Sequence, residues 1–358
     1  MLTHRERVLL ALQHRETDRI PLAMVCSGIN PPADKRFDQY LREHHGTTMQ
    51  AYLDAHIDAE MIWVGLKKPP AEGFDMWGIH RVKVPNPTGS GGYRWHTDFR
   101  PLAKAETLED LARHDWPTVE MMDYEGLAAQ VKKIRDTTDK AIVLGNGNIF
   151  EASWYMRGFE EIFIDLATEP EFVNALFTRV CDFWVEHFTR ALQAIPGEVD
   201  LVFTADDIAG QQGLLMSLPM WEEFIKPHHR RLNERIHELG AKVIYHSDGA
   251  VMEAVPGLMD MGIDVLQALQ FDAAGMDPET LKSLYGDRLC FEGGVSVQHT
   301  LPFGTPDDVR REVALLISTL GKNGGYILGP SHVIQEETPA ENIVAMFETA
   351  LNFTPATL

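Results

Sequence analysis

The sequence contains few cysteines, few basic residues and no long apolar run. Its three cysteines, Cys26, Cys181 and Cys290, form no CxxC pair, which excludes the disulfide framework of a small secreted domain and favours a reducing, cytoplasmic location. No window approaches the roughly 18 uncharged apolar residues that a membrane span needs. The N-terminus also lacks the uninterrupted apolar core of a signal peptide.

Basic residues are far outnumbered by acidic ones. The chain has 32 Lys and Arg against 53 Asp and Glu, a formal net charge of -21. Such a field disfavours nucleic acids and anionic membrane surfaces as partners. A negatively charged ligand would therefore need a local arginine pocket.

Short apolar runs alternate with longer helical patterns along the 358 residues. This alternation is typical of strand and helix units repeated on a parallel sheet. Eight such runs, the number that closes a barrel, lie at about 19–26, 58–64, 141–146, 199–205, 241–246, 263–268, 287–292 and 324–329. The sequence therefore predicts an α/β fold, a single (β/α)8 TIM barrel over residues 1–358.

Helical patterns between these runs carry capping residues. We expect helices over 171–192, 219–239 and 306–320, the last capped by Thr305, and an N-terminal helix with a capping box of Thr3 and Glu6. The stretch from about 67 to 120 breaks the alternation. We interpret it as a β-hairpin insertion after the second strand, with its turn at 89–92.

Two histidines follow predicted strands, His246 after the fifth and His332 after the eighth. Loops after the strands of a barrel share one face, so these side chains are expected to meet there with Asp248, two positions beyond His246. Two imidazoles and a carboxylate indicate a metal site or an acid/base cluster. With Glu292 at the seventh strand, a shared zinc ion is favoured. The alternative, Asp248 as a helix cap with His246 bonded to backbone, stays open.

Other polar residues also follow the predicted strands. Asp206 and Asp207 come after the fourth strand, where adjacent acids either cap a helix or act as a cation ligand or general base. His228 and His229 have the pattern of a surface pair. The remaining residues at or just after strand ends include Cys26, Asn30, Asn146, Asn148, Glu151, Gln267, Gln270 and Glu292.

Substrate contacts are expected from residues near the same rim. Arg157 has two interpretations, an anchor for a substrate carboxylate or an ion pair with Glu160 or Glu161 on its own helix. The expected substrate-binding residues are Asn148, Trp154, Arg157, Gln267 and Glu292.

Four segments together resemble the uroporphyrinogen decarboxylase superfamily. They read TADDIAGQQGLLMSLPMWEEFIKPHHRRL from Thr204, YHSDG from Tyr245, GVSVQHTLPFGTPDDVRREV from Gly294 and GGYILGPSHVIQEETPAENI from Gly324, and the opening RERVLLALQHRETDRIPLAM is similar too. The resemblance implies an eight-stranded barrel. It also implies one of two chemistries: metal-free decarboxylation of uroporphyrinogen, or zinc-assisted methyl transfer to or from a corrinoid on a partner protein.

Departures from the two patterns favour the methyltransferase-like branch. The decarboxylases resembled here carry arginines after the first strand and an aspartate after the second, and both are missing from 24–30 and 62–66. The methyltransferases carry a His-x-Cys zinc motif after the fifth strand and a cysteine after the eighth. Here the histidine is His246, and Asp248 and His332 stand at the two cysteine positions. A histidine at the last position also resembles the decarboxylases.

We therefore expect a methyltransferase that demethylates a small methoxylated or methylated compound, with transfer to a corrinoid protein. The expected metal ligands are His246, Asp248 and His332, and Asp206 or Asp207 would orient the substrate. One alternative is a metal-independent carboxy-lyase with His332 and Asp248 as acid/base partners. Another is a non-catalytic barrel that binds a corrinoid partner. The sequence leaves open the methyl donor, the partner and the oligomeric state, a homodimer included.

Overall fold

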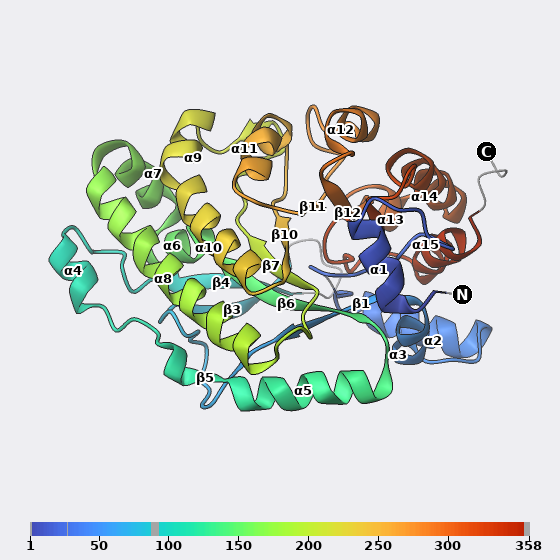
Figure 1. The fold of residues 1–358 in the computed structure, drawn as a ribbon, viewed down its shortest axis with the longest axis horizontal. Coiled ribbons are helices and arrows are strands. Elements are labelled where there is room, and N and C mark those ends of the chain that lie inside the picture. The colour runs from blue at the N-terminus through green and yellow to red at the C-terminus, as the bar shows by residue number, and fades with distance from the viewer. Residues whose placement is uncertain (1, 27, 87–92, 354–358) are drawn as a thin grey trace.

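Apolar segments form a curled parallel sheet of seven strands at the centre of the fold (Figure 1). The computed structural model describes residues 2–26, 28–86 and 93–353. In sheet order the strands are β1 (Ala59–Trp63), β6 (Ala141–Asn148), β7 (Leu201–Ala205), β10 (Lys242–His246), β11 (Val265–Ala268), β12 (Cys290–Val295) and β13 (Tyr326–Pro330). Every residue of the last three strands is buried, as expected for a parallel sheet covered on both faces.

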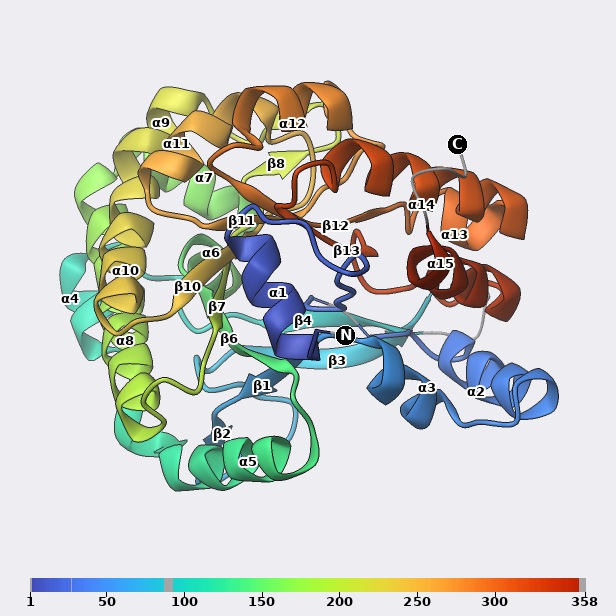
Figure 2. The same cartoon turned by 45° about the vertical axis from the view of Figure 1, so that its right-hand side comes forward.

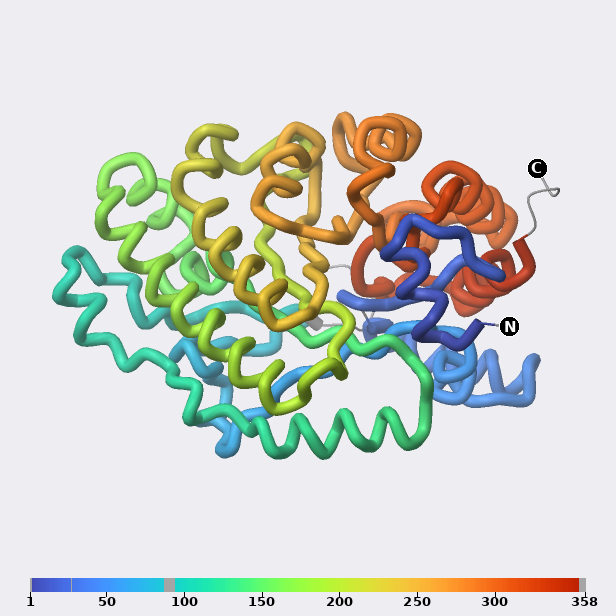
Figure 3. The backbone as a smooth tube through the Cα atoms, viewed as in Figure 1, coloured from blue at the N-terminus to red at the C-terminus, as the bar shows by residue number. Residues whose placement is uncertain are grey.

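Helices pack around the outside of the sheet. Figure 3 shows the chain winding round it in one direction, so that the blue N-terminal segments lie beside the red C-terminal ones. The outer helices are α2 (Ala33–His44), α3 (Met49–His56), α5 (Tyr124–Thr137), α8 (Pro170–Ala194), α10 (Lys226–Glu238), α11 (Val255–Asp260), α12 (Pro278–Tyr285), α14 (Pro306–Leu320) and α15 (Ala340–Asn352). The remaining described helices are α4 (Leu108–Arg113), α6 (Phe150–Arg157), α7 (Phe159–Thr168), α9 (Leu218–Phe224) and α13 (Thr300–Phe303), with 3-10 turns at Val119–Met121 and Met252–Ala254. Among the described residues, no helix is both long and apolar enough to cross a membrane.

The N-terminal helix α1 (His4–Leu12) covers one end of the curled sheet (Figure 2). Its buried Val8 and Ala11 share a core cluster with inward-facing strand residues such as Leu201, Ile244 and Cys290. This apolar packing closes the end of the sheet opposite the carboxyl ends of the strands, where sites of this fold lie.

The α/β class with a parallel sheet is confirmed, but the described residues contain seven sheet strands where eight are predicted. The run at 19–26 supplies a single parallel bridge, Leu22 to Leu328. Pro21 has no amide hydrogen, and the amide of Leu22 donates to the Asp58 carboxylate (2.8 Å) in place of a strand backbone. The Leu22 carbonyl still accepts from the Asp58 amide (2.7 Å), so this segment lies between the two edge strands.

The segment from 67 to 120 departs from strand and helix alternation. Within it, β3 (His80–Pro85) and β4 (Tyr93–Phe99) pair antiparallel, and the turn expected at 89–92 lies outside the described residues. Four other short strands complete the list: β2 (Gly65–Leu66) pairs with β5 (Met122–Asp123), and β8 (Ala209–Gly210) pairs with β9 (Gly213–Leu214). Arg81 of β3 stacks over Tyr155 of α6. Asn86, just after β3, bonds Glu336, which follows β13. The β3 strand is therefore held against two segments that come after strands of the main sheet.

The predicted helix starts are largely confirmed. Thr3 and Glu6 form a capping box at α1, and Thr305 and Asp308 form one at α14. The helix predicted over 219–239 is instead two helices, α9 and α10. The break falls at Ile225, just before Pro227, whose ring disfavours a helical conformation in the preceding residues.

The buried carboxylate of Asp58 holds together the segments at the end of the sheet that α1 covers. Asp58 is fully buried and accepts bonds from Arg7 (2.6 Å), Arg19 (2.7 and 2.9 Å) and His4 (2.7 Å), besides the Leu22 amide. These hydrogen bonds connect α1, the 19–26 run and the residue just before β1.

Replacing Asp58 with Asn is expected to lower the free energy of unfolding by about 3 kcal/mol or more, because two guanidinium groups lose their buried counter-charge. Urea denaturation followed by circular dichroism measures this. Asp136→Asn, which removes an exposed ion pair with Lys132, serves as the control and should cost about 0.5 kcal/mol or less. An equal loss of unfolding free energy in the two variants would show that Asp58 does not stabilise this end of the fold through its buried ion pairs.

Candidate functional site

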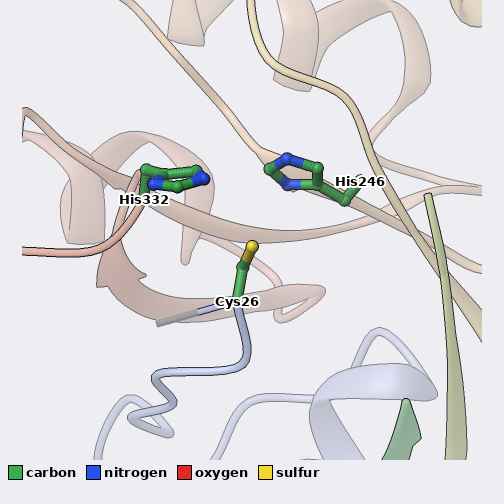
Figure 4. A group of neighbouring side chains, drawn as sticks. All are labelled: Cys26, His246 and His332. Atoms are coloured by element: carbon green, nitrogen blue, oxygen red, sulfur yellow. The ribbon is translucent and has the colours of Figure 1, made fainter. Parts of the chain in front are cut away.

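Three potential metal ligands meet at the carboxyl ends of the strands: Cys26, His246 and His332 (Figure 4). Each offers a ligand atom, and these atoms lie within 4.8 Å of one another. His246 is the last residue of β10, and His332 follows β13. Cys26 ends the 19–26 run, whose Leu22 bridges Leu328 of β13. The two imidazole ring centroids are 5.6 Å apart. We call this group the Cys26 cluster.

A hydrogen bond orients the His246 ring. Its Nδ1 bonds Oε1 of Gln267, the residue that faces it in register on β11. A proton on Nδ1 leaves the lone pair on Nε2, which is the arrangement found in metal-ligating histidines. The sequence expectation for Gln267 was substrate binding, whereas its contact here is with the His246 ring.

A second group of potential ligands shares His246. It contains Asp207 and Asp248, whose Oδ1 atoms lie 3.6 and 4.0 Å from His246 Nε2. The backbone amide of Asp248 donates to Asp207 Oδ1 (2.8 Å). Among the described residues, the predicted trio of His246, Asp248 and His332 is thus divided between two groups that meet at one imidazole.

In the Cys26 cluster, the thiolate and the two imidazolium groups stabilise each other's charged forms. Burial alone would raise the pKa of the Cys26 thiol, but charge interaction and hydrogen bonding with His246 and His332 outweigh burial and lower this pKa to about 6. Burial likewise opposes protonation of both imidazoles, and the neighbouring thiolate raises their pKa values nonetheless. The cluster therefore favours a thiolate at neutral pH, the form that binds metals.

Glu292 is a buried carboxyl whose charge interacts with Cys26 and His246. It is 1% exposed, and its polar neighbours are the Gln267 side chain and the Val25 backbone. Burial raises its pKa well above the usual value, and the Cys26 charge raises it further.

Glu151, near the start of α6, adds a second unusual carboxyl at the rim. Burial, together with the charges of Asp207 and Asp206, raises the pKa of Glu151 to about 8. Asn148 donates a hydrogen bond to it (3.4 Å). At neutral pH this carboxyl carries a proton, the property of a general acid.

Asp206 has the capping role that its sequence also allowed. Its carboxylate accepts from the amides of Ile149 (3.2 Å), Phe150 (2.9 Å) and Glu151 (2.8 Å) at the start of α6, and it bonds His229. Fully committed in this way, Asp206 is not available to orient a substrate, which leaves Asp207 as the candidate. His229 is fully buried, so the expectation of a surface histidine pair was wrong.

Two expected substrate contacts have other partners. The Arg157 guanidinium bonds Asp165 (2.7 and 3.3 Å) and the carbonyls of Leu102 (3.1 Å) and Ala103 (3.0 Å), so neither an ion pair on its own turn nor a free carboxylate anchor is observed. Trp154 is 8% exposed and belongs to the apolar core. Neither side chain is among the described residues that line the cavity beside His332.

A cavity of about 410 Å³ reaches the two ligand groups. Its wall includes Asp248 and His332 together with Val297, Gln298, Pro302, Phe303, Gln335 and Glu337. Among the described residues this wall carries acidic, amide, imidazole and apolar groups and neither lysine nor arginine. A small, uncharged or cationic molecule fits such a lining better than a polyanion.

The thiol of Cys26 is the member of the cluster that the sequence argument did not assign as a ligand. Cys26 follows the first predicted strand, and this position was the available signal. The described part of 19–26 forms an isolated bridge and no regular strand, however, so strand alternation does not predict where its side chains point.

Comparison with known proteins identifies the family. The profile described as uroporphyrinogen decarboxylase (URO-D) matches residues 95–353. The chain belongs to the uroporphyrinogen decarboxylase family. It is 31% identical to a uroporphyrinogen decarboxylase of Psychromonas ingrahamii and 20% identical to one of Pseudoalteromonas translucida, with 94% of each chain covered in both cases. The resemblance seen in the four sequence segments is confirmed.

A solved structure of the same fold is described as a methyltransferase from Methanosarcina mazei. It superposes with a TM-score of 0.69 at 17% identity and covers 99% of each chain. At this identity the likeness establishes the shared fold only.

In protein treated with a chelator, iodoacetamide should modify Cys26 with a pH midpoint near about 6, because the thiolate is the nucleophile. Cys181 and Cys290, whose thiol pKa values burial raises to about 12, should stay unmodified at neutral pH. Peptide mass spectrometry after timed labelling measures all three sites. His332→Ala should move the Cys26 midpoint upward, and a midpoint near the ordinary thiol value of about 8.5 in the unsubstituted protein would contradict the description.

Proposed function

We propose that this protein is a methyltransferase that removes a methyl group from a small methoxylated or otherwise methylated compound. A divalent metal, with zinc the best match, would be held at His246 and His332. The methyl group would pass to the cobalt of a corrinoid carried by a separate protein. The observation that carries the proposal is the convergence of two ligand groups on His246, with one further member of each group, His332 and Asp248, on the wall of one cavity.

The residues present fit a zinc ion. Imidazole nitrogen, thiolate sulfur and carboxylate oxygen are the donors that zinc takes, and a catalytic zinc site keeps a position open for substrate. The buried carboxyl of Glu292 interacts electrostatically with Cys26 and His246, so it would lie close to a cation held there. When bound, zinc would supply a Lewis acid that polarises the oxygen carrying the methyl group.

The surrounding side chains have defined tasks in such a reaction. Gln267 fixes the His246 ring through Nδ1 and keeps Nε2 turned to the site. Glu151 holds a proton at its carboxyl oxygen and can donate it to the oxygen that loses its methyl group, with Asn148 positioning that carboxyl. Asp207 and Asp248 face the same space and can orient the donor.

Charge separates this proposal from decarboxylation of a porphyrinogen. The named relatives are uroporphyrinogen decarboxylases, yet the described cavity wall contains no guanidinium, and Arg157 is committed to Asp165. A substrate with many carboxylates would meet acidic groups at Asp207, Asp248 and Glu337, and the described wall contains no lysine or arginine to bind its carboxylates. A metal-independent carboxy-lyase acting on a smaller carboxylate is the second candidate, favoured by the names of the relatives.

A panel of methoxylated and methylated compounds, assayed with reduced cobalamin as methyl acceptor, tests the reaction. We expect at least one donor to lose its methyl group, measured by chromatography and by the cobalamin absorbance. His246→Ala and His332→Ala should each lower the rate by about 100-fold or more, because each removes a ligand. His45→Ala, on an exposed loop, is the control. Release of carbon dioxide from uroporphyrinogen or a smaller carboxylate, without methyl transfer, would overturn the proposal.

The rate of methyl transfer should also fall as the pH rises through about 8. The pKa of Glu151 is raised, so its proton is present below that pH and is lost above it. A pH profile of kcat measures this limb. Glu151→Gln should abolish the limb while lowering the rate, and an unchanged profile in that variant would show that Glu151 is not the acid.

A further inference from the structure

The two segments that carry Cys26 and His332 are tied together by backbone bridges on both sides of the cluster. Leu22 bridges Leu328 and Ile29 bridges Ile334, both in parallel orientation. The Ala23 amide donates to the Leu328 carbonyl (3.0 Å), and the Asn30 amide donates to the Ile334 carbonyl (2.9 Å). Cys26 and His332 lie between these bridges, so main-chain hydrogen bonds fix their approach.

The thiol is also directed at both imidazoles. Figure 4 shows the Cys26 sulfur pointing up between the rings of His246 and His332. The three ligand atoms lie within 4.8 Å of one another, so small side-chain movements would bring all three within bonding distance of one ion. Cys26 is only partly buried, whereas Cys181 and Cys290 are buried elsewhere in the fold.

Asp248 belongs to the other side of His246. Its backbone amide donates to Asp207, and its Oδ1 lies 4.0 Å from His246 Nε2, among the longest ion-pair distances of the described residues. The chain turns sharply at Gly249, which has a positive φ of 87° and whose space is limited by the Gly210 carbonyl. This turn leaves Asp248 on the cavity wall beside His332.

We propose that Cys26, and not Asp248, is the third protein ligand of the metal beside His246 and His332. The site is then an N₂S site with one thiolate, and Asp207 and Asp248 face the bound methyl donor. A thiolate selects a borderline or soft ion such as zinc over magnesium or calcium. This inference rests on the proposed function only in requiring that a metal binds here.

X-ray absorption at the zinc edge tests the ligand set directly. The zinc-loaded protein should show one sulfur at about 2.3 Å together with nitrogen or oxygen at about 2.0–2.1 Å. Cys26→Ser should lose the sulfur shell, and its zinc affinity, measured by competition with a chromogenic chelator, should fall by about 100-fold. Asp248→Asn should keep the sulfur shell, with affinity changed by about 10-fold or less.

Cys181→Ala is the matched control, because it removes a thiol and should leave the sulfur shell unchanged. Circular dichroism and the urea midpoint establish that each variant is folded. In cobalt-loaded protein, the thiolate charge-transfer absorption gives a second readout, present in the unsubstituted protein and absent from Cys26→Ser.

The outcomes separate this inference from the proposed function. A sulfur ligand without methyl transfer to any acceptor supports the Cys26 assignment and counts against the methyltransferase. Methyl transfer by a protein whose zinc has only nitrogen and oxygen ligands supports the methyltransferase and counts against the Cys26 assignment. A sulfur shell that persists in Cys26→Ser, or zinc lost from Asp248→Asn with Cys26→Ser unaffected, overturns the inference.

Discussion

The site depends on the parallel ladder that aligns the carboxyl ends of the strands. Backbone pairing places His246 beside Gln267 on the next strand, and the bridges at Leu22 and Ile29 bring the Cys26 segment against β13. Residues separated by hundreds of positions in sequence therefore share one rim. Without this register, two imidazoles and a thiol would have no reason to meet.

The interior of the curled sheet is apolar at one end of its axis and polar at the other. At the end covered by α1 it is filled with apolar groups, including Val8, Ala11 and Leu201. At the other end it carries His246, Gln267 and Glu292, all nearly or fully buried. Polar groups buried in this way are costly when charged, and burial raises the pKa of the Glu292 carboxyl well above its usual value. Groups with such perturbed pKa values are typical of functional sites.

Much of the fold was predictable from the sequence, because buried parallel strands are short apolar runs and helix starts carry caps such as Thr305. The meeting of His246 and His332 was predictable from the rule that loops after parallel strands share a face. The first predicted strand was not realised as a sheet strand, since Pro21 lacks an amide hydrogen and the Leu22 amide bonds a side chain. Cys26 follows that irregular segment, so its direction could not be inferred from alternation. Trp154 and Arg157 lie on a helix that turns them into other contacts, which sequence position alone does not reveal.

Anomalous scattering at the zinc edge, from crystals of protein produced with zinc in the growth medium, is the most direct test of the central claim. The account predicts one strong peak within bonding distance of Cys26 Sγ and of one nitrogen each from His246 and His332. A zinc ion found elsewhere on the chain, with these three side chains turned apart and unliganded, would contradict it.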